Sequence, residues 1–77
     1  MREDYISEYW NENKTRHAII SKDEYHYIVR MQAKYYGVMR EYRTELLEGK
    51  NEMYAEDCAE NFVMAIGSFK DLDWEGR

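Results

Sequence analysis

The chain has 77 residues, which is enough for one small domain and no more. Its formal net charge is −5, and Ile, Leu, Val and Phe together supply only 13 residues, a composition that alone is typical of disorder. Eight Tyr, two Trp and five Met argue against disorder, because disordered chains are poor in large aromatic residues. We therefore expect one folded domain, residues 1–77, whose interior depends on tyrosine rings.

A domain of this size buries little apolar surface and commonly needs a disulfide, a metal or a partner to be stable. The chain contains a single Cys, so an internal disulfide is excluded and self-association is the expected supplement. No apolar run is long enough to span a bilayer, and the N-terminus lacks the pattern of a signal peptide. These features predict a cytoplasmic protein without a membrane contact.

The first element expected is a short helix over residues 3–12, because Tyr5, Ile6, Tyr9 and Trp10 would lie within one arc. So short a helix is marginal in water and must pack on the rest of the domain. Residues 13–20 are interpreted as a connector, within which 16–20 are a candidate extended segment that could pair with a second copy. The N-terminal helix and connector together make up residues 1–20.

A capping box at Ser21-Lys22-Asp23-Glu24 predicts the start of a long helix. Gly49 is suited to the left-handed position at its end. We therefore expect a helix over about 22–48. The apolar positions between these limits follow helical spacing: Ile28, Met31, Tyr35, Val38, Met39, Tyr42 and Leu46.

Asn51 predicts the cap of a further helix over about 52–70, with Glu52 near its positive end. The connection between the two helices is too short for any arrangement but an antiparallel one. The sequence thus predicts an all-α fold, in which residues 21–70 form a helical hairpin and residues 71–77 an acidic tail. In that hairpin Tyr42 would face Cys58 and Ala59, so that large residues meet small ones.

A second apolar strip on the long helix is a candidate self-association face. The strip consists of Tyr25, Val29, Tyr36 and Leu47, with Arg40 and Arg43 beside Tyr36, and the proposed contact residues are Tyr25, Val29, Tyr36, Arg40 and Arg43. Tyr and Arg are enriched at the centres of protein interfaces, so this strip favours a homodimer. The alternative is that the N-terminal helix and the tail cover the strip within one chain.

Acidic residues are concentrated in the second half, where residues 44–77 contain nine acidic and three basic groups. The candidate partner-binding residues are Glu52, Glu56, Asp57, Glu60, Asp71, Asp73 and Trp74. An acidic surface of this kind fits a partner protein with a basic surface, because complementary potential speeds encounter and favours the correct partner. The alternative is a solvated face that only keeps the protein soluble.

The sequence offers no catalytic, metal or cofactor motif. Residues 71–76 resemble the opening of a calcium-binding loop, but the chain ends before the bidentate Glu that such a loop needs. His17 and His26 stand alone, and Cys58 is interpreted as a small core residue. Basic residues do not form one stripe, since Arg30 and Lys34 would point away from Arg40 and Arg43, so direct nucleic-acid binding is not expected.

These observations predict a non-enzymatic, acidic protein-binding module that inhibits or modulates its partner. It would engage a basic surface, one that could otherwise hold nucleic acid, by charge mimicry. In size, acidity and aromatic content the chain resembles the small inhibitory proteins of phages and mobile elements. The alternative function is a structural or assembly subunit that acts through the Tyr/Arg-rich self-association face.

Overall fold

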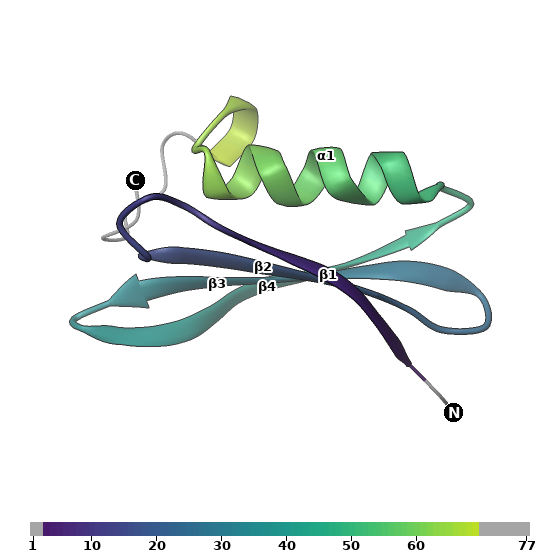
Figure 1. The fold of residues 1–77 in the computed structure, drawn as a ribbon, viewed down its shortest axis with the longest axis horizontal. Coiled ribbons are helices and arrows are strands. Elements are labelled where there is room, and N and C mark those ends of the chain that lie inside the picture. Colours follow the sequence, from purple (N-terminus) through teal and green to yellow (C-terminus); the bar gives the residue numbers. More distant parts are fainter. Residues whose placement is uncertain (1–2, 70–77) are drawn as a thin grey trace.

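The computed structural model describes residues 3–69, which form a four-stranded antiparallel sheet with one helix packed across it (Figure 1). The strands follow one another in the sheet in chain order, from β1 at one edge to β4 at the other. The elements are β1 (Asp4–Trp10), β2 (Arg16–Lys22), β3 (His26–Tyr35), β4 (Val38–Glu48), α1 (Glu52–Val63) and the 3-10 turn η1 (Gly67–Phe69). The expected all-α helical hairpin is therefore wrong: the fold is α+β.

The expected long helix over 22–48 is two strands, β3 and β4, joined by a turn at Tyr36 and Gly37. The helical spacing was misleading because its members lie on both faces of the sheet. Met31 is in the core beneath α1, whereas Ile28 lies on the opposite face, three residues away along a strand. On a strand, residues two positions apart share a face, so Val29, Met31 and Ala33 lie together under the helix.

The capping box at Ser21–Glu24 does not start a helix. Ser21 lies in β2, and its hydroxyl donates to a carboxylate oxygen of Glu3 at 2.6 Å. The box instead marks the turn between β2 and β3, where the side chain of Asp23 accepts hydrogen bonds from the backbone amides of Tyr25 and His26. Aspartate is favoured in turns for this reason, so the same residues serve a turn as readily as a helix start.

The N-terminal helix expected over 3–12 is also wrong, since β1 occupies this segment. Ile6 and Tyr9 pack against the core, while Trp10 lies on the other face, where it stacks on His17 with ring centroids 4.0 Å apart. Residues 16–20 are extended, as part of β2. Their neighbours are β1 and β3 of the same chain, not a second copy.

Only the last expected helix exists, and it is shorter than expected. The Asn51 side chain caps it by accepting a hydrogen bond from the Tyr54 amide at 2.9 Å. The helix ends at Val63 and the backbone turns at Ala65, so the segment 52–70 is not one helix. Gly49 has the left-handed conformation expected of it, but it follows a strand.

The core lies between the sheet and α1. Its buried residues are Ala18, Ile20, Val29, Met31, Ala33, Leu47, Ala55, Ala59, Phe62, Val63 and Phe69. Small residues of the helix, Ala55 and Ala59, let it approach the sheet closely. Large side chains meet at its end, where the Phe62 ring stacks on Tyr42 and meets Phe69 edge-on. Tyr42 thus contributes a ring to the core, but from a strand.

The β3–β4 turn holds an aromatic residue in a strained conformation. Tyr36 and Gly37 both have positive φ, +53° and +78°, as the two-residue type I′ turn requires, and Tyr36 is 80% exposed. Asn is favoured at this first position, whereas a bulky side chain is strained there. We expect Tyr36→Asn to raise the free energy of unfolding by about 0.5–1 kcal/mol. The thermal midpoint would rise by a few degrees.

Tyr36→Ala is the matched control, because it removes the ring without giving the backbone a residue that tolerates positive φ. Thermal unfolding of the three proteins separates the two effects. A midpoint for Tyr36→Asn at or below that of Tyr36→Ala would contradict the assignment of strain to this turn.

Candidate functional site

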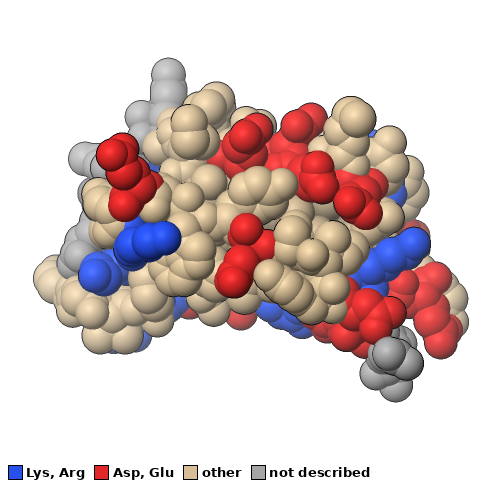
Figure 2. Space-filling model, in the orientation of Figure 1, with Lys and Arg blue, Asp and Glu red and all other residues tan. Residues whose placement is uncertain are grey.

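The outer face of α1 is the first candidate site. The helix buries Ala55, Ala59, Phe62 and Val63 against the sheet, and its residues Glu52, Asp57 and Glu60 are exposed. Glu52, Glu56 and Glu60 follow one another at intervals of four and therefore form one row along the helix. Acidic side chains gather along α1 in the space-filling view (Figure 2). The structure thus brings together the predicted residues Glu52, Glu56, Asp57 and Glu60.

The carboxylates of this row repel one another. The pKa of Glu56 is raised above its ordinary value, first by partial loss of hydration, then by its hydrogen bond with Glu52. The negative charges of Glu52, Asp57 and Glu60 raise it further. Like charges four residues apart on a helix are destabilising, so Glu56 and Glu60 are not explained by the stability of the helix, whereas Glu52 is favourable in its first turn.

The negative potential of the row reaches the neighbouring strand. Tyr9 of β1 has a raised pKa, caused first by its burial and then by the charges of Glu56, Glu60 and Glu52. The row therefore lies close enough to Tyr9 for its charges to disfavour the ionised phenol.

Ion pairs within the described residues lie elsewhere on the molecule. They join Glu3 to Arg30 and Arg43 to Glu45, while the carboxylates of Glu8 and Asp23 contact the rings of His17 and His26. Between residues 3 and 69 no cation pairs with Glu52, Glu56, Asp57 or Glu60. The acidic face of α1 therefore keeps its charge toward solvent.

Large apolar side chains stand beside the carboxylates. Met53 is 70% exposed, and Tyr54 and Met64 are also exposed. Met and Tyr are enriched at the cores of protein interfaces. The combination of exposed apolar side chains and carboxylates without a cationic partner in residues 3–69 makes this face a candidate contact surface. We call Glu52, Met53, Glu56, Asp57, Glu60 and Met64 the acidic helix face.

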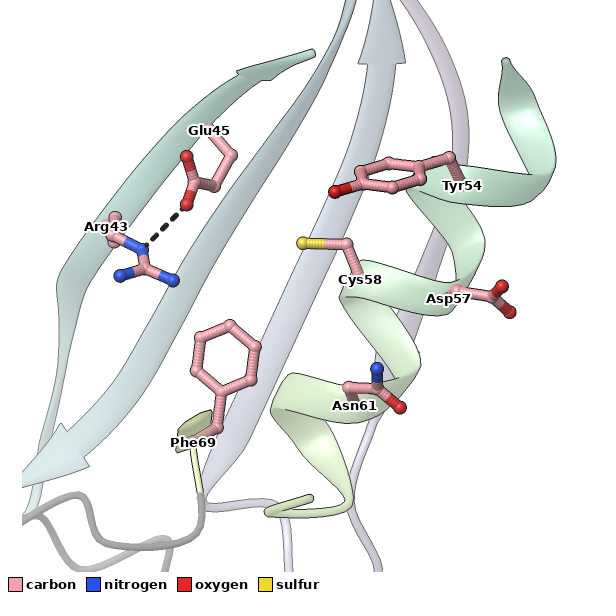
Figure 3. A pocket seen from close by; sticks show the side chains of 7 residues that line it. All are labelled: Arg43, Glu45, Tyr54, Asp57, Cys58, Asn61 and Phe69. Atoms are coloured by element: carbon pink, nitrogen blue, oxygen red, sulfur yellow. Dashed lines mark ion pairs between the residues drawn. The ribbon is translucent and has the colours of Figure 1, made fainter. Parts of the chain in front are cut away.

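A groove of about 420 Å³ separates α1 from β4 (Figure 3). It exists because α1 packs over β1, β2 and β3 and leaves the helix-facing side of β4 largely open. Its lining residues are Arg43, Glu45, Tyr54, Asp57, Cys58, Asn61 and Phe69. Tyr54 and Cys58 point toward the strand, whereas Asp57 points away from it (Figure 3). Across the groove, Arg43 and Glu45 form an ion pair at 3.1 Å.

The groove does not provide an activated nucleophile. Burial raises the pKa of the Cys58 thiol, and the charge of Glu45 raises it further, against the weaker opposite effect of Arg43. The thiolate is the nucleophilic form, so Cys58 is poorly suited to covalent catalysis. Its half-buried position fits the small core residue expected from the sequence.

The two histidines take part in separate side-chain contacts. His17 contacts a carboxylate oxygen of Glu8 through Nε2 at 2.5 Å and the amide oxygen of Gln32 through Nδ1 at 3.2 Å. His26 lies 3.2 Å from a carboxylate oxygen of Asp23. Within residues 3–69 no group of three or more His, Cys, Asp or Glu side chains is placed to hold a metal ion.

The predicted self-association face does not exist as one surface. Val29 is fully buried, and Tyr25 and Tyr36 lie in turns at opposite ends of β3. Arg40 and Arg43 lie together on β4. Of the predicted partner-binding residues, Asp71, Asp73 and Trp74 lie outside the described residues.

Met53, Tyr54 and Glu45 were not among the candidate residues expected from the sequence. Met53 and Tyr54 follow the Asn51 cap and are both exposed, so the core does not account for either residue. Glu45 could not be linked to Arg43 without knowing that both lie on a strand, where residues two apart share a face.

No helix within residues 3–69 has the length and apolar content needed to cross a membrane. Neither a protein-family model, nor a curated protein, nor a solved structure matches the chain.

Proposed function

We propose that the protein is a non-enzymatic binding module that engages a basic surface of a partner protein through the acidic helix face. The observation that carries the proposal is the row of carboxylates on α1, which repel one another and have no cationic partner within residues 3–69. A cationic surface would relieve this repulsion on binding. The partner would accordingly be selected by charge complementarity.

The exposed apolar side chains would add binding affinity that charged contacts alone do not provide. Ion pairs at the rim of an interface contribute little affinity, whereas buried apolar anchors contribute much of it. Met53 and Met64 are placed to be covered when a partner contacts the carboxylates, and methionine adapts its shape readily. The partner surface therefore carries apolar residues among its cations. A surface that otherwise holds a nucleic-acid backbone is one source of such cations, and its occupation would inhibit the partner.

The test compares two triple substitutions of equal charge. Glu52→Gln, Glu56→Gln and Glu60→Gln together neutralise the row on α1. The matched control changes Glu12, Glu24 and Glu41 to Gln, three exposed residues that are not part of α1. We expect the first variant to bind a deca-lysine peptide at least about tenfold more weakly than the control variant does, because the control keeps the concentrated charge.

Amide chemical shifts during the peptide titration report where binding occurs. Shifts concentrated on residues 52–64 support the proposal, whereas shifts spread over all acidic segments contradict it. In capture from cell extract, the partner retained by the parent protein and the control should be lost from the first variant and should carry a basic surface. Equal loss from both variants would overturn the proposal.

A further inference from the structure

The outer edge of β4 is a second surface that the fold leaves uncovered. β4 is the longest strand and the last in the sheet, so the backbone groups on its outer side have no neighbouring strand within residues 3–69. An edge of this kind is a template for another strand unless it is protected. The strand contains an extra residue near Tyr42, where the pairing with β3 shifts, but the residues on either side of Thr44, from Arg43 to Glu45, pair regularly with β3.

The other edge strand, β1, is protected against pairing with itself. It carries only acidic charges, Asp4 and Glu8, with Glu3 immediately before it. Two copies of β1 side by side would place carboxylates together, and like charges on neighbouring strands are destabilising. β1 also has an irregular register between Tyr5 and Ser7.

β4 differs because charges of opposite sign alternate on its helix-facing side. Arg43 and Glu45 both line the groove beside α1 and therefore share a face, with Thr44 between them on the opposite face. In an antiparallel pair of identical strands centred on Thr44, Arg43 of each copy lies directly opposite Glu45 of the other. The two oppositions are equivalent by the twofold axis, as in any isologous contact.

We propose that β4 pairs antiparallel with β4 of a second copy, with Thr44 opposite Thr44, so that two sheets join into one. The pair of Arg43 and Glu45 within each chain, 3.1 Å apart, becomes part of a four-charge network across the axis. Cross-strand pairs of opposite charge and of threonine both stabilise sheets. The occupant is a second copy because the charge pattern of the edge is complementary to itself.

This contact differs from the helical self-association face expected from the sequence, although it uses one residue of that prediction, Arg43. It leaves the acidic helix face exposed to solvent. The dimer and the binding of a basic partner can therefore succeed or fail independently.

The decisive experiment exchanges charges across the axis. Arg43→Glu places only carboxylates at the four positions, and Glu45→Arg places only guanidinium groups there. We expect the parent protein to reach twice its monomer mass of 9.4 kDa in light scattering as its concentration rises. Each variant alone should dimerise at least about tenfold more weakly, because like charges in a contact oppose it.

An equimolar mixture of the two variants should recover the dimer, since the carboxylate introduced at position 43 of one variant then meets the guanidinium introduced at position 45 of the other. This rescue also excludes misfolding of either variant as the cause of its loss. Lys22→Glu and Glu24→Arg, which make matching charge changes at exposed positions away from β4, should leave the dimer unchanged. A monomeric parent at millimolar concentration, or no recovery in the mixture, would overturn the proposal.

Disulfide trapping tests the register. In a Cys58→Ser background, Thr44→Cys should cross-link two copies, because directly opposite Cα atoms of an antiparallel pair lie within disulfide range. Leu46→Cys should not, since the two residues would be offset by four positions, about 13 Å along the strand. The alternative register places Leu46 opposite Leu46 and would cover this side chain, which is 61% exposed in the single chain. Cross-linking of Leu46→Cys without Thr44→Cys would overturn the proposed register.

Discussion

Arg16→Ala should lower the free energy of unfolding by about 3–5 kcal/mol. The Arg16 side chain is fully buried and joins β2 to the end of α1. Its Nη1 donates to the carbonyl oxygen of Phe62 at 2.7 Å and to that of Phe69 at 3.2 Å, and its guanidinium lies over the Phe62 ring. Alanine would leave a cavity and remove a donor from both carbonyls. A small domain has roughly 0.05–0.15 kcal/mol of stability per residue, so a loss of this size is a large fraction of the total.

Arg16→Met separates the packing of this side chain from its charge. Burial lowers the pKa of the guanidinium, against the opposite effect of Tyr42, and Nε and Nη2 have no partner within residues 3–69. Methionine removes these costs and fills much of the space, so a smaller loss of about 1–2 kcal/mol is expected. Urea unfolding measures both changes. A loss below about 1 kcal/mol for Arg16→Ala would contradict the role of Arg16 in joining sheet and helix.

Phe62→Ala should be comparably destabilising, by about 3–5 kcal/mol. Phe62 is fully buried, and three neighbours depend on its ring: Tyr42 stacks on it, Phe69 meets it edge-on, and Arg16 lies over its face. Removal of the ring opens a cavity where the sheet, α1 and η1 meet. Phe62→Leu retains most of the volume and should cost clearly less.

The measurement is again urea unfolding, and it extends to the double variant with Arg16→Met. Because the two side chains are in contact, their losses should not add. Simple additivity would show that the cation and the ring stabilise the fold separately. Equal losses for Phe62→Ala and Phe62→Leu would contradict the cavity as the cause.

The start of the last helix was predicted correctly from the sequence, but the secondary structure predicted for most of the chain was wrong. The role of Asn51 as a helix cap could be predicted because a cap depends on local hydrogen bonds, and Asn51 forms the expected one. The strands were missed because Tyr, Val and Ile recur at spacings that fit the period of a helix as well as that of a strand. Strand propensity was nevertheless high, since β-branched and aromatic residues are frequent from Tyr25 to Leu47. Together with Gly37 in the middle, it favoured a hairpin over one long helix.

The acidic row could be predicted because residues four apart share a side of any helix, whatever the helix packs against. The residues of the predicted self-association face do not share a surface, because only a helix that does not form would have brought them together. Val29 shows the reason: on a helix it shared a strip with Tyr25, but on a strand it alternates into the core. Tertiary contacts decided between the two periods, and a single sequence does not contain them.

The sequential order of the strands has a consequence for how the chain reaches its folded state. Each strand pairs with its immediate successor, across turns of only a few residues, and α1 docks last in chain order. Short loops close at low entropic cost, and topologies built from nearby contacts fold faster than those in which distant segments must meet. The hairpins can therefore assemble in the order in which a ribosome delivers them, with the helix completing the cooperative unit.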